Sequence, residues 1–359
     1  LGIDIGSSSI KVVQLKKKKG KAVLETYGEL STGPYSNTEI GRATNLPTPE
    51  ITKALKELIK EAKVDAKQCG ISIPLKSSMI FTIDLPAVES RQLDKMVPLE
   101  ARKYVPVPIS EVALDWRIIP ESQNSDISFE ESHNEKIAEK DKVSGKVKVL
   151  VVAIHKTAIR NYEEVAKELG LELRFLEIEI FSTIRSVIGR DISTVAILDI
   201  GAGKSKLYII EYGVVRESHI INRGSQSITL AMSRSGDMSF VEAEKVKRNV
   251  GLVKIGDESS LSIGSSLNLD YIFNESARVM RRYQSKNNKN ISKVILAGGG
   301  VVMTGMLDYA SKVLESDIVI SDPFSKVEAP AFLIDALKEV GPEFSVSLGL
   351  ALRGLRLSE

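Results

Sequence analysis

Cysteine, histidine and tryptophan are scarce in this chain of 359 residues. The single cysteine, Cys69, excludes an internal disulfide bond and indicates a reducing compartment. The three histidines, at positions 133, 155 and 219, lie too far apart for a zinc-binding motif. No apolar run approaches the length of about 18 residues that a membrane-spanning helix needs. A disulfide-stabilised scaffold, a zinc module and a membrane-spanning protein are therefore disfavoured.

The chain also lacks a strong net charge. It carries 49 basic and 47 acidic residues, a balance of +2, which gives no reason to expect a nucleic-acid partner. Hydrophobic residues make up 43% of the chain and charged residues 27%, as in an ordinary soluble globular protein. The length is large for a single core, so we expect two or more subdomains.

A short stretch near the N-terminus occurs again near the middle of the chain. Ile3 to Lys11 aligns without a gap with Leu198 to Lys206, and each copy contains Asp-Ile-Gly and a lysine seven residues after the aspartate. Both copies lie between apolar runs, a pattern that predicts a strand, a tight turn and a second strand. Two equivalent hairpins predict two related half-domains that face one another, with a ligand between their turns.

The turns of these hairpins have the composition of a phosphate-binding site. Glycine and small polar residues let backbone N–H groups point into one concavity, and the residues concerned are Gly6, Ser7, Ser8, Ser9, Gly201, Ala202 and Gly203. Lys11 and Lys206 add positive charge, and Asp4 and Asp199 are suited to a hydrated Mg²⁺. The structural alternative is glycines that serve tight turns and aspartates that cap them. For both hairpins together, we favour phosphate binding.

Two further motifs extend this prediction. An apolar strand runs into Gly298, Gly299 and Gly300, followed by Met303, and such a turn lets the backbone lie against a flat ligand. Glu244 and Lys247 share one face of a helix whose capping box begins at Ser239, and they are placed to reach an adenosine edge. Alone, these motifs would be a plain turn and a solvated ion pair. Neither a Walker A loop nor a Rossmann fingerprint is present.

The segment between the hairpins does not follow the duplicated pattern. We expect four parts: a first half (1–70, 173–192 and 340–359), an inserted α/β subdomain (71–172), a second half (193–225 and 290–339) and an outer subdomain (226–289). Within the insert, the polar residues 121–142 are expected to form a loop.

This set of motifs resembles the actin-like ATPase superfamily, which includes actin, sugar kinases, chaperone ATPases and FtsA. The resemblance implies an α/β fold of two duplicated RNase H-like half-domains with an FtsA-type inserted subdomain. Asp4 to Lys11 and Asp199 to Lys206 match its phosphate motifs, and Ala297 to Gly300 matches its adenosine motif. Glu244 and Lys247 match the helix that brackets base and ribose. ATP or ADP, with Mg²⁺ held through water by Asp4 and Asp199, is the implied ligand.

Within the superfamily, the chain resembles the PilM family of type IV pilus assembly proteins. The matching stretches are Gly2 to Val13, Glu100 to Pro106, Val112 to Trp116 and Phe344 to Gly354. The resemblance implies a cytoplasmic protein that docks the cytoplasmic N-terminal peptide of PilN in a cleft beside the insert. It also implies other pilus assembly proteins and motor ATPases as partners, self-association, and contact with the inner membrane only through partners.

The chain departs from the superfamily in ways that bear on catalysis. Lys204 and Lys206 stand where hydrolysing relatives tend to carry threonine or another small polar residue. Glu179 opens the helix between the halves, where relatives place a water-orienting catalytic residue, although an acidic residue at a helix N-terminus is an equal explanation. ATP hydrolysis is therefore expected to be weak or absent. The alternative functions are an FtsA-like filament-forming ATPase and a sugar-kinase-type phosphotransferase.

Overall fold

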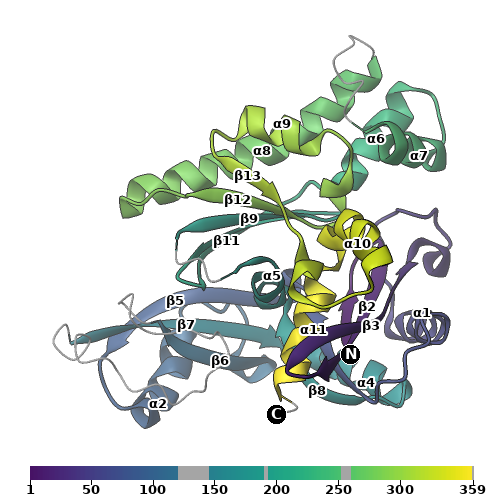
Figure 1. Ribbon diagram of the computed structural model, residues 1–359. Coiled ribbons are helices and arrows are strands. Elements are labelled where there is room, and N and C mark those ends of the chain that lie inside the picture. The colour runs from purple at the N-terminus through teal and green to yellow at the C-terminus, as the bar shows by residue number, and fades with distance from the viewer. Residues whose placement is uncertain (120–144, 190–192, 252–259, 358–359) are drawn as a thin grey trace.

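The computed structural model describes residues 1–119, 145–189, 193–251 and 260–357. The loop expected at 121–142 lies outside the described residues. The described chain forms two five-stranded sheets and one three-stranded sheet, and helices α5 (Glu179–Val187) and α11 (Ser345–Leu357) lie centrally among them (Figure 1).

The first half is built on a sheet in the order β3-β2-β1-β4-β8. Its strands are β1 (Gly2–Ile5), β2 (Ser9–Lys18), β3 (Lys21–Ser31), β4 (Gln68–Ile73) and β8 (Glu172–Ile178). Side chains alternate between its faces along each strand. Val12 accordingly packs with α1 (Thr48–Glu61) and α4 (Lys156–Glu168), whereas Val13 packs with α11. Helices therefore cover both faces of the sheet.

The second half repeats this plan, with strand order β11-β10-β9-β12-β13. Its strands are β9 (Val195–Ile200), β10 (Ser205–Glu211), β11 (Val214–Ile221), β12 (Lys293–Ala297) and β13 (Asp317–Ile320). Ile197 packs with α5, whereas Leu198 packs in the core under α8 (Ser260–Asn287) and α9 (Met306–Val313). Because both faces are buried, β9 consists of apolar residues almost throughout.

The duplication predicted from the sequence is confirmed by the two sheets. In each, three antiparallel strands are followed by two parallel ones. The registers are also equivalent, because Asp4 lies opposite Lys11 on β1 and β2, and Asp199 lies opposite Lys206 on β9 and β10. The same residue types therefore lie at the same place in both halves.

The inserted subdomain contains a three-stranded sheet in the order β5-β7-β6 with one helix against it. Its elements are β5 (Ser78–Pro86), α2 (Ser90–Ala101), β6 (Val112–Ile119) and β7 (Lys146–His155). The sequence placed 71–172 in the insert, but the structure puts both ends of that range elsewhere. β4 pairs with β1, and α4 packs on α1 in the first half. The parallel pairing of β4 with β1 joins strands that are far apart in the sequence, so no local sequence pattern revealed it.

Several elements in the C-terminal part of the sequence were missed by the sequence analysis. They are α6 (Ser225–Ser235), β13 and α10 (Ile334–Val340), while α7 (Phe240–Val250) has the predicted capping box. α6 is rich in serine and threonine, which have weak helix propensity. It is stabilised by packing, because Ile228 and Met232 lie in the core with α8.

Helices α5 and α11 cross with their backbones almost in contact. A Cβ atom added to Gly349 of α11 would lie 1.9 Å from the carbonyl oxygen of Ser182 on α5. Gly354, on the same helix, has no described atom within 4 Å of such a Cβ. Gly349 is therefore a packing requirement, whereas Gly354 is not.

We predict that Gly349→Ala lowers the free energy of unfolding by about 1–3 kcal/mol, because the added methyl group forces α5 and α11 apart. The matched control, Gly354→Ala, should instead stabilise it by about 0.5–1 kcal/mol, because alanine lowers the entropy of the unfolded chain. Urea unfolding followed by circular dichroism measures both. Equal stabilities for the two variants would contradict the assigned crossing.

Candidate functional site

A cavity of about 1040 Å³ lies between the two halves. Its volume is at the upper end of the roughly 300–1,000 Å³ typical of small-molecule sites. All the residues predicted to bind the ligand line it, together with Glu179: Asp4, Gly6, Ser7, Ser8, Ser9, Lys11, Asp199, Gly201, Ala202, Gly203, Lys206, Glu244, Lys247, Gly298, Gly299, Gly300 and Met303. The structure thus brings together motifs that are far apart in the sequence. Their role in nucleotide binding stays a prediction.

The two hairpin turns have the same internal geometry. The N–H of Gly6 donates to the carbonyl oxygen of Ser9 at 3.0 Å, and the N–H of Gly201 donates to that of Lys204 at 3.1 Å. The turns face one another, since a Cβ on Gly203 would lie 3.6 Å from Oγ of Ser7. The small residues therefore form two opposed walls of the cavity.

The glycine turn after β12 is held against the second hairpin. Gly298 has φ of 86°, and a Cβ there would lie 2.3 Å from Oδ1 of Asp199 and 2.7 Å from the carbonyl oxygen of Ile200. Only glycine combines this backbone conformation with so close an approach. The turn consequently brings exposed backbone to the cavity beside Asp199.

Lys11 is surrounded by acceptors that the sequence did not reveal. Its Nζ donates to Oγ of Ser9 at 2.6 Å and lies 3.1 Å from Glu29 and 3.8 Å from Glu343. Burial alone would lower the pKa of Lys11, but these carboxylates more than offset burial and raise it. Lys11 is therefore a fixed positive charge at the edge of the first turn.

Lys206 makes different contacts at the equivalent position. Its Nζ lies 2.6 Å from Oε2 of Glu179 and 3.3 Å from Oδ2 of Asp199. Oε1 of Glu179 accepts the N–H of Leu75 at 2.7 Å, so both oxygens of this carboxylate are engaged. The arrangement leaves Glu179 little freedom to orient a water molecule, and its catalytic role stays a prediction.

The two aspartates at the predicted magnesium position are already engaged by other side chains. Oδ1 of Asp4 accepts a hydrogen bond from Ser72 at 2.7 Å, and burial raises the pKa of Asp4. Asp199 is already paired with Lys206. In the described part of the chain, no three or more His, Cys, Asp or Glu side chains are grouped so as to hold a metal ion. These residues fit a divalent cation poorly.

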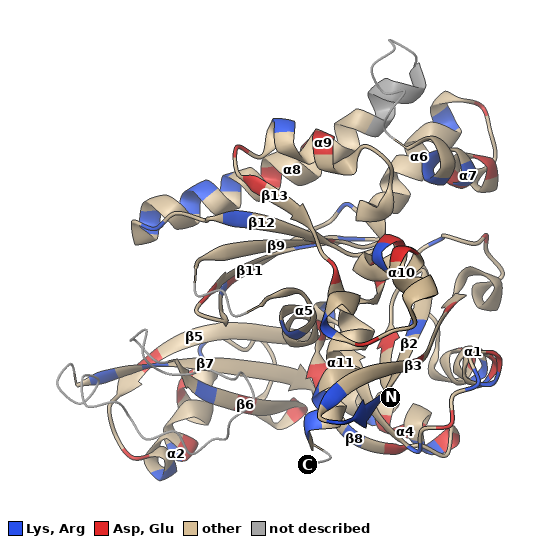
Figure 2. Ribbon diagram, viewed as in Figure 1, with Lys and Arg blue, Asp and Glu red and all other residues tan. Residues whose placement is uncertain are grey.

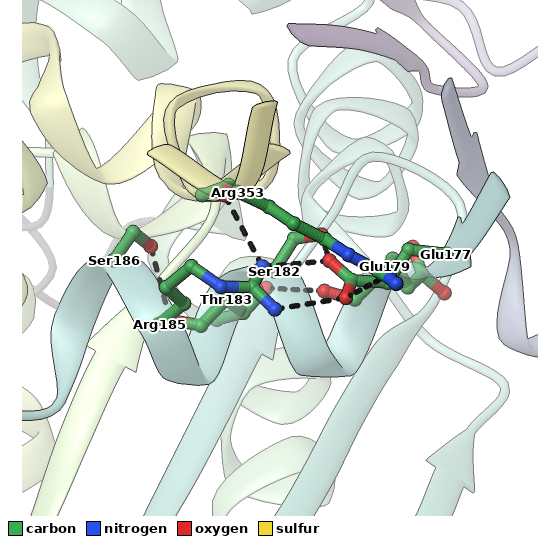
Figure 3. Close-up of polar contacts among 8 residues, drawn as sticks. Glu177, Glu179, Ser182, Thr183, Arg185, Ser186 and Arg353 are labelled. Atoms are coloured by element: carbon green, nitrogen blue, oxygen red, sulfur yellow. Dashed lines mark hydrogen bonds and ion pairs between the residues drawn. The ribbon is translucent and has the colours of Figure 1, made fainter. Parts of the chain in front are cut away.

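Glu177 of β8 and Glu179, the first residue of α5, both lie at the start of α5 (Figure 3), but they make different contacts. Glu177 pairs with Arg185 at 2.7 and 2.8 Å and with Arg353 of α11 at 2.7 Å, and it also accepts from Ser182. Burial opposes its ionisation, but the two arginines and Ser182 hold its pKa below the ordinary value. Glu177 therefore anchors α5 to α11, while Glu179 lines the cavity.

Glu244 and Lys247 form an ion pair, as the structural alternative to adenosine binding implied, but the pair is buried rather than solvated. Their side chains are each 9% exposed and lie 2.6 Å apart, and both bind the hydroxyl of Thr229. The pair is therefore fixed in the wall of the cavity. Arg248 lies 2.9 Å from the other oxygen of Glu244 and was missed, although its spacing from Glu244 on α7 was a usable signal.

The loop between β3 and α1 joins both halves at the cavity and was also missed. The N–H of Thr44 donates to the carbonyl oxygen of Ser7 at 2.7 Å in the first half. The N–H of Ala43 donates to Oε1 of Gln226 on α6 at 2.8 Å in the second. Composition indicated only a loop here, because such contacts depend on the tertiary fold.

Figure 2 shows lysine and arginine interspersed with aspartate and glutamate along the ribbon of both halves. None of the helices in the described part of the chain has the length and apolar character that a bilayer crossing demands.

Comparisons with known proteins agree on the fold. A family model described as type IV pilus assembly protein PilM matches residues 2–355. The structure of a PilM–PilN type IV pilus biogenesis complex aligns with a TM-score of 0.80 and 23% identity, over 99% of this chain and 98% of that one. The ethanolamine utilization protein EutJ of Carboxydothermus hydrogenoformans aligns with a TM-score of 0.54 and 14% identity, over 98% and 88%.

A curated relative is the cell division protein FtsA of Neisseria meningitidis serogroup B. It is 20% identical over 379 aligned positions, which cover 97% of this chain and 88% of the relative. At these identities the structural likenesses show the fold alone, and they confirm the predicted actin-like fold.

The contrast between Glu177 and the exposed Glu172 on the same strand yields a prediction. Glu177→Gln should destabilise the protein by about 3–5 kcal/mol at neutral pH, because two arginines lose their buried partner. Glu172→Gln removes an exposed partner of Arg174 and should leave the free energy of unfolding nearly unchanged.

The effect of Glu177→Gln should also depend on pH. The folded-state pKa of Glu177 lies below its ordinary value of 4.5, so its stabilisation is fully present above that pH. The difference from wild type should shrink as pH falls below 4.5 and through the lower folded-state pKa. Denaturant unfolding at several pH values measures this, and a difference that grows on acidification would refute the assignment.

Proposed function

The chain belongs to the family of type IV pilus assembly protein PilM, and we propose that it is a nucleotide-binding scaffold of pilus assembly. In this proposal, ATP or ADP binds between the two halves. The nucleotide sets the relative position of the halves, which are joined at α5 and α11, and thereby the position of the insert.

One observation carries the nucleotide proposal. Two equivalent hairpin turns and a glycine turn, from segments far apart in the sequence, line a single cavity. Opposed turns with backbone N–H groups and an adjacent lysine suit the phosphates, and the buried pair of Glu244 and Lys247 would reach the base and ribose. The sequence also predicts a Mg²⁺ ion at Asp4 and Asp199. The proposed site does not include this ion, because the ammonium group of Lys206 is paired with Asp199.

A second part of the proposal concerns the partner. The PilM–PilN complex supports PilN as the partner, and we place its cytoplasmic N-terminal peptide beside the insert. A second, smaller cavity lies there, between the insert and α4, and its lining includes Glu111, His155, Lys156 and Arg160. Docking of PilN would hold the protein at the cytoplasmic face of the inner membrane, where other pilus assembly proteins and motor ATPases are the further partners. Membrane contact would be indirect.

An FtsA-like filament-forming ATPase is the second candidate. The FtsA of Neisseria meningitidis aligns with nearly the whole chain, which favours a shared architecture and leaves self-association open. The match of residues 2–355 to the PilM family favours the pilus role over it.

We predict that Lys11→Ala combined with Lys206→Ala weakens ATP binding at least about 100-fold, because two charge-assisted contacts to the phosphates are lost. The control, Lys286→Ala, removes an exposed lysine on α8 and should bind like wild type. Isothermal titration calorimetry measures the affinities, and circular dichroism confirms folding. An unchanged affinity for ATP in a folded double variant would contradict the assignment of the site.

We also predict that a synthetic PilN N-terminal peptide from the same organism binds the wild-type protein. Arg160→Glu should weaken this binding at least about tenfold, because it reverses a charge in the smaller cavity. Arg174→Glu makes the same change on β8 outside both cavities and serves as the control. Fluorescence anisotropy of a labelled peptide gives the affinities. An equal loss of peptide affinity in both variants would contradict docking of the peptide in the smaller cavity.

A further inference from the structure

We infer that the ammonium group of Lys206 takes the place of a divalent cation beside Asp199, so that this protein binds nucleotide without needing Mg²⁺. The inference rests on the proposed nucleotide site and deepens it, because it names the ligand as the metal-free nucleoside di- or triphosphate. Four observations carry it.

The first observation is an asymmetry between two equivalent positions. Lys11 and Lys206 each lie opposite the aspartate of their own hairpin. Lys11 nevertheless turns to Ser9, Glu29 and Glu343, whereas Lys206 pairs with Asp199 itself. The first aspartate, Asp4, takes its hydrogen bond from Ser72 instead. Of the two hairpins, the second therefore has its aspartate in a direct ion pair with its own lysine.

The second observation is the donor count of Lys206. An ammonium group has three N–H donors, and its contacts to Glu179 and Asp199 account for two of them. Because Lys206 lines the cavity between the halves, the remaining donor is available to a phosphate oxygen. A lysine bound in this way links a protein carboxylate to a ligand phosphate, which is the electrostatic task of a bridging cation.

The third observation concerns the carboxylates that a cation would need. Oε2 of Glu179 and Oδ2 of Asp199 accept from Lys206, and Oε1 of Glu179 accepts the N–H of Leu75. A hydrated Mg²⁺ needs such oxygens free to accept from its waters. Displacing Lys206 to free them would leave a buried ammonium group without its partners, which is strongly unfavourable.

The fourth observation is that a positive charge already occupies this place. The ammonium group of Lys206 lies between the carboxylates of Glu179 and Asp199, at 2.6 Å from the first and 3.3 Å from the second. The described acidic side chains around it also do not form a metal-binding group. A dication would thus approach a fixed like charge, in a place where its ligands are already engaged.

The experiment compares nucleotide affinity with Mg²⁺ and with excess EDTA. Wild-type protein should bind ATP with affinities that differ less than about fivefold between the two conditions. In Lys206→Met, which keeps the length of the side chain, affinity in EDTA should fall at least about tenfold and recover when Mg²⁺ is added. Lys11→Met should weaken binding equally in both conditions, and Lys286→Met should behave like wild type.

The outcomes separate the two proposals. Wild-type binding that is lost in EDTA and restored by Mg²⁺ would overturn the role of Lys206 while leaving the nucleotide site in place. Absence of ATP and ADP binding in both conditions would overturn the proposed function itself, and this inference with it. If Lys206→Met does not fold, the wild-type comparison alone still decides between a metal-dependent and a metal-independent site.

Discussion

The arrangement of the cavity depends on the contact between α5 and α11. Gly349 lets the two helix backbones meet at Ser182, and Glu177 ties both helices together through Arg185 and Arg353. Helix α5 begins at Glu179, and its apolar residues pack beneath the second sheet. A shift of α5 would therefore move Glu179, and with it both Lys206 and the N–H of Leu75 that precedes the insert. The cavity between the halves and the insert are joined through the first residue of one helix.

The duplicated hairpins show how one motif supports different electrostatics in two copies. Register fixes the lysine opposite the aspartate in both, but the surroundings decide which acceptor each lysine takes. Glu29 and Glu343 lie within reach of Lys11, whereas Glu179 lies within reach of Lys206. Equivalent positions in the two halves thus share a strand register but make different side-chain contacts.

Much of the fold and the site could be predicted because the signals are local. Alternating apolar runs marked the meanders, the capping box at Ser239 marked α7, and glycine and serine marked the turns. The remainder could not be predicted, because it depends on distant contacts. β4 belongs to the first sheet through its pairing with β1, and α6 is a helix because it packs on α8. Glu343 reaches Lys11 from the far end of the chain, where no motif marks it.

The place of α11 has a consequence for how the chain folds as it is synthesised. Val13 of β2 is buried against Leu348 and Ala351 of α11, so an early strand of this sequence is covered by a helix that is synthesised much later. The second sheet, in contrast, is made of segments that all emerge earlier. Contacts of such high sequence separation close slowly, and domains generally fold as units during translation. We therefore expect the second half to complete its core first, while one apolar face of the first sheet stays uncovered until α11 is synthesised.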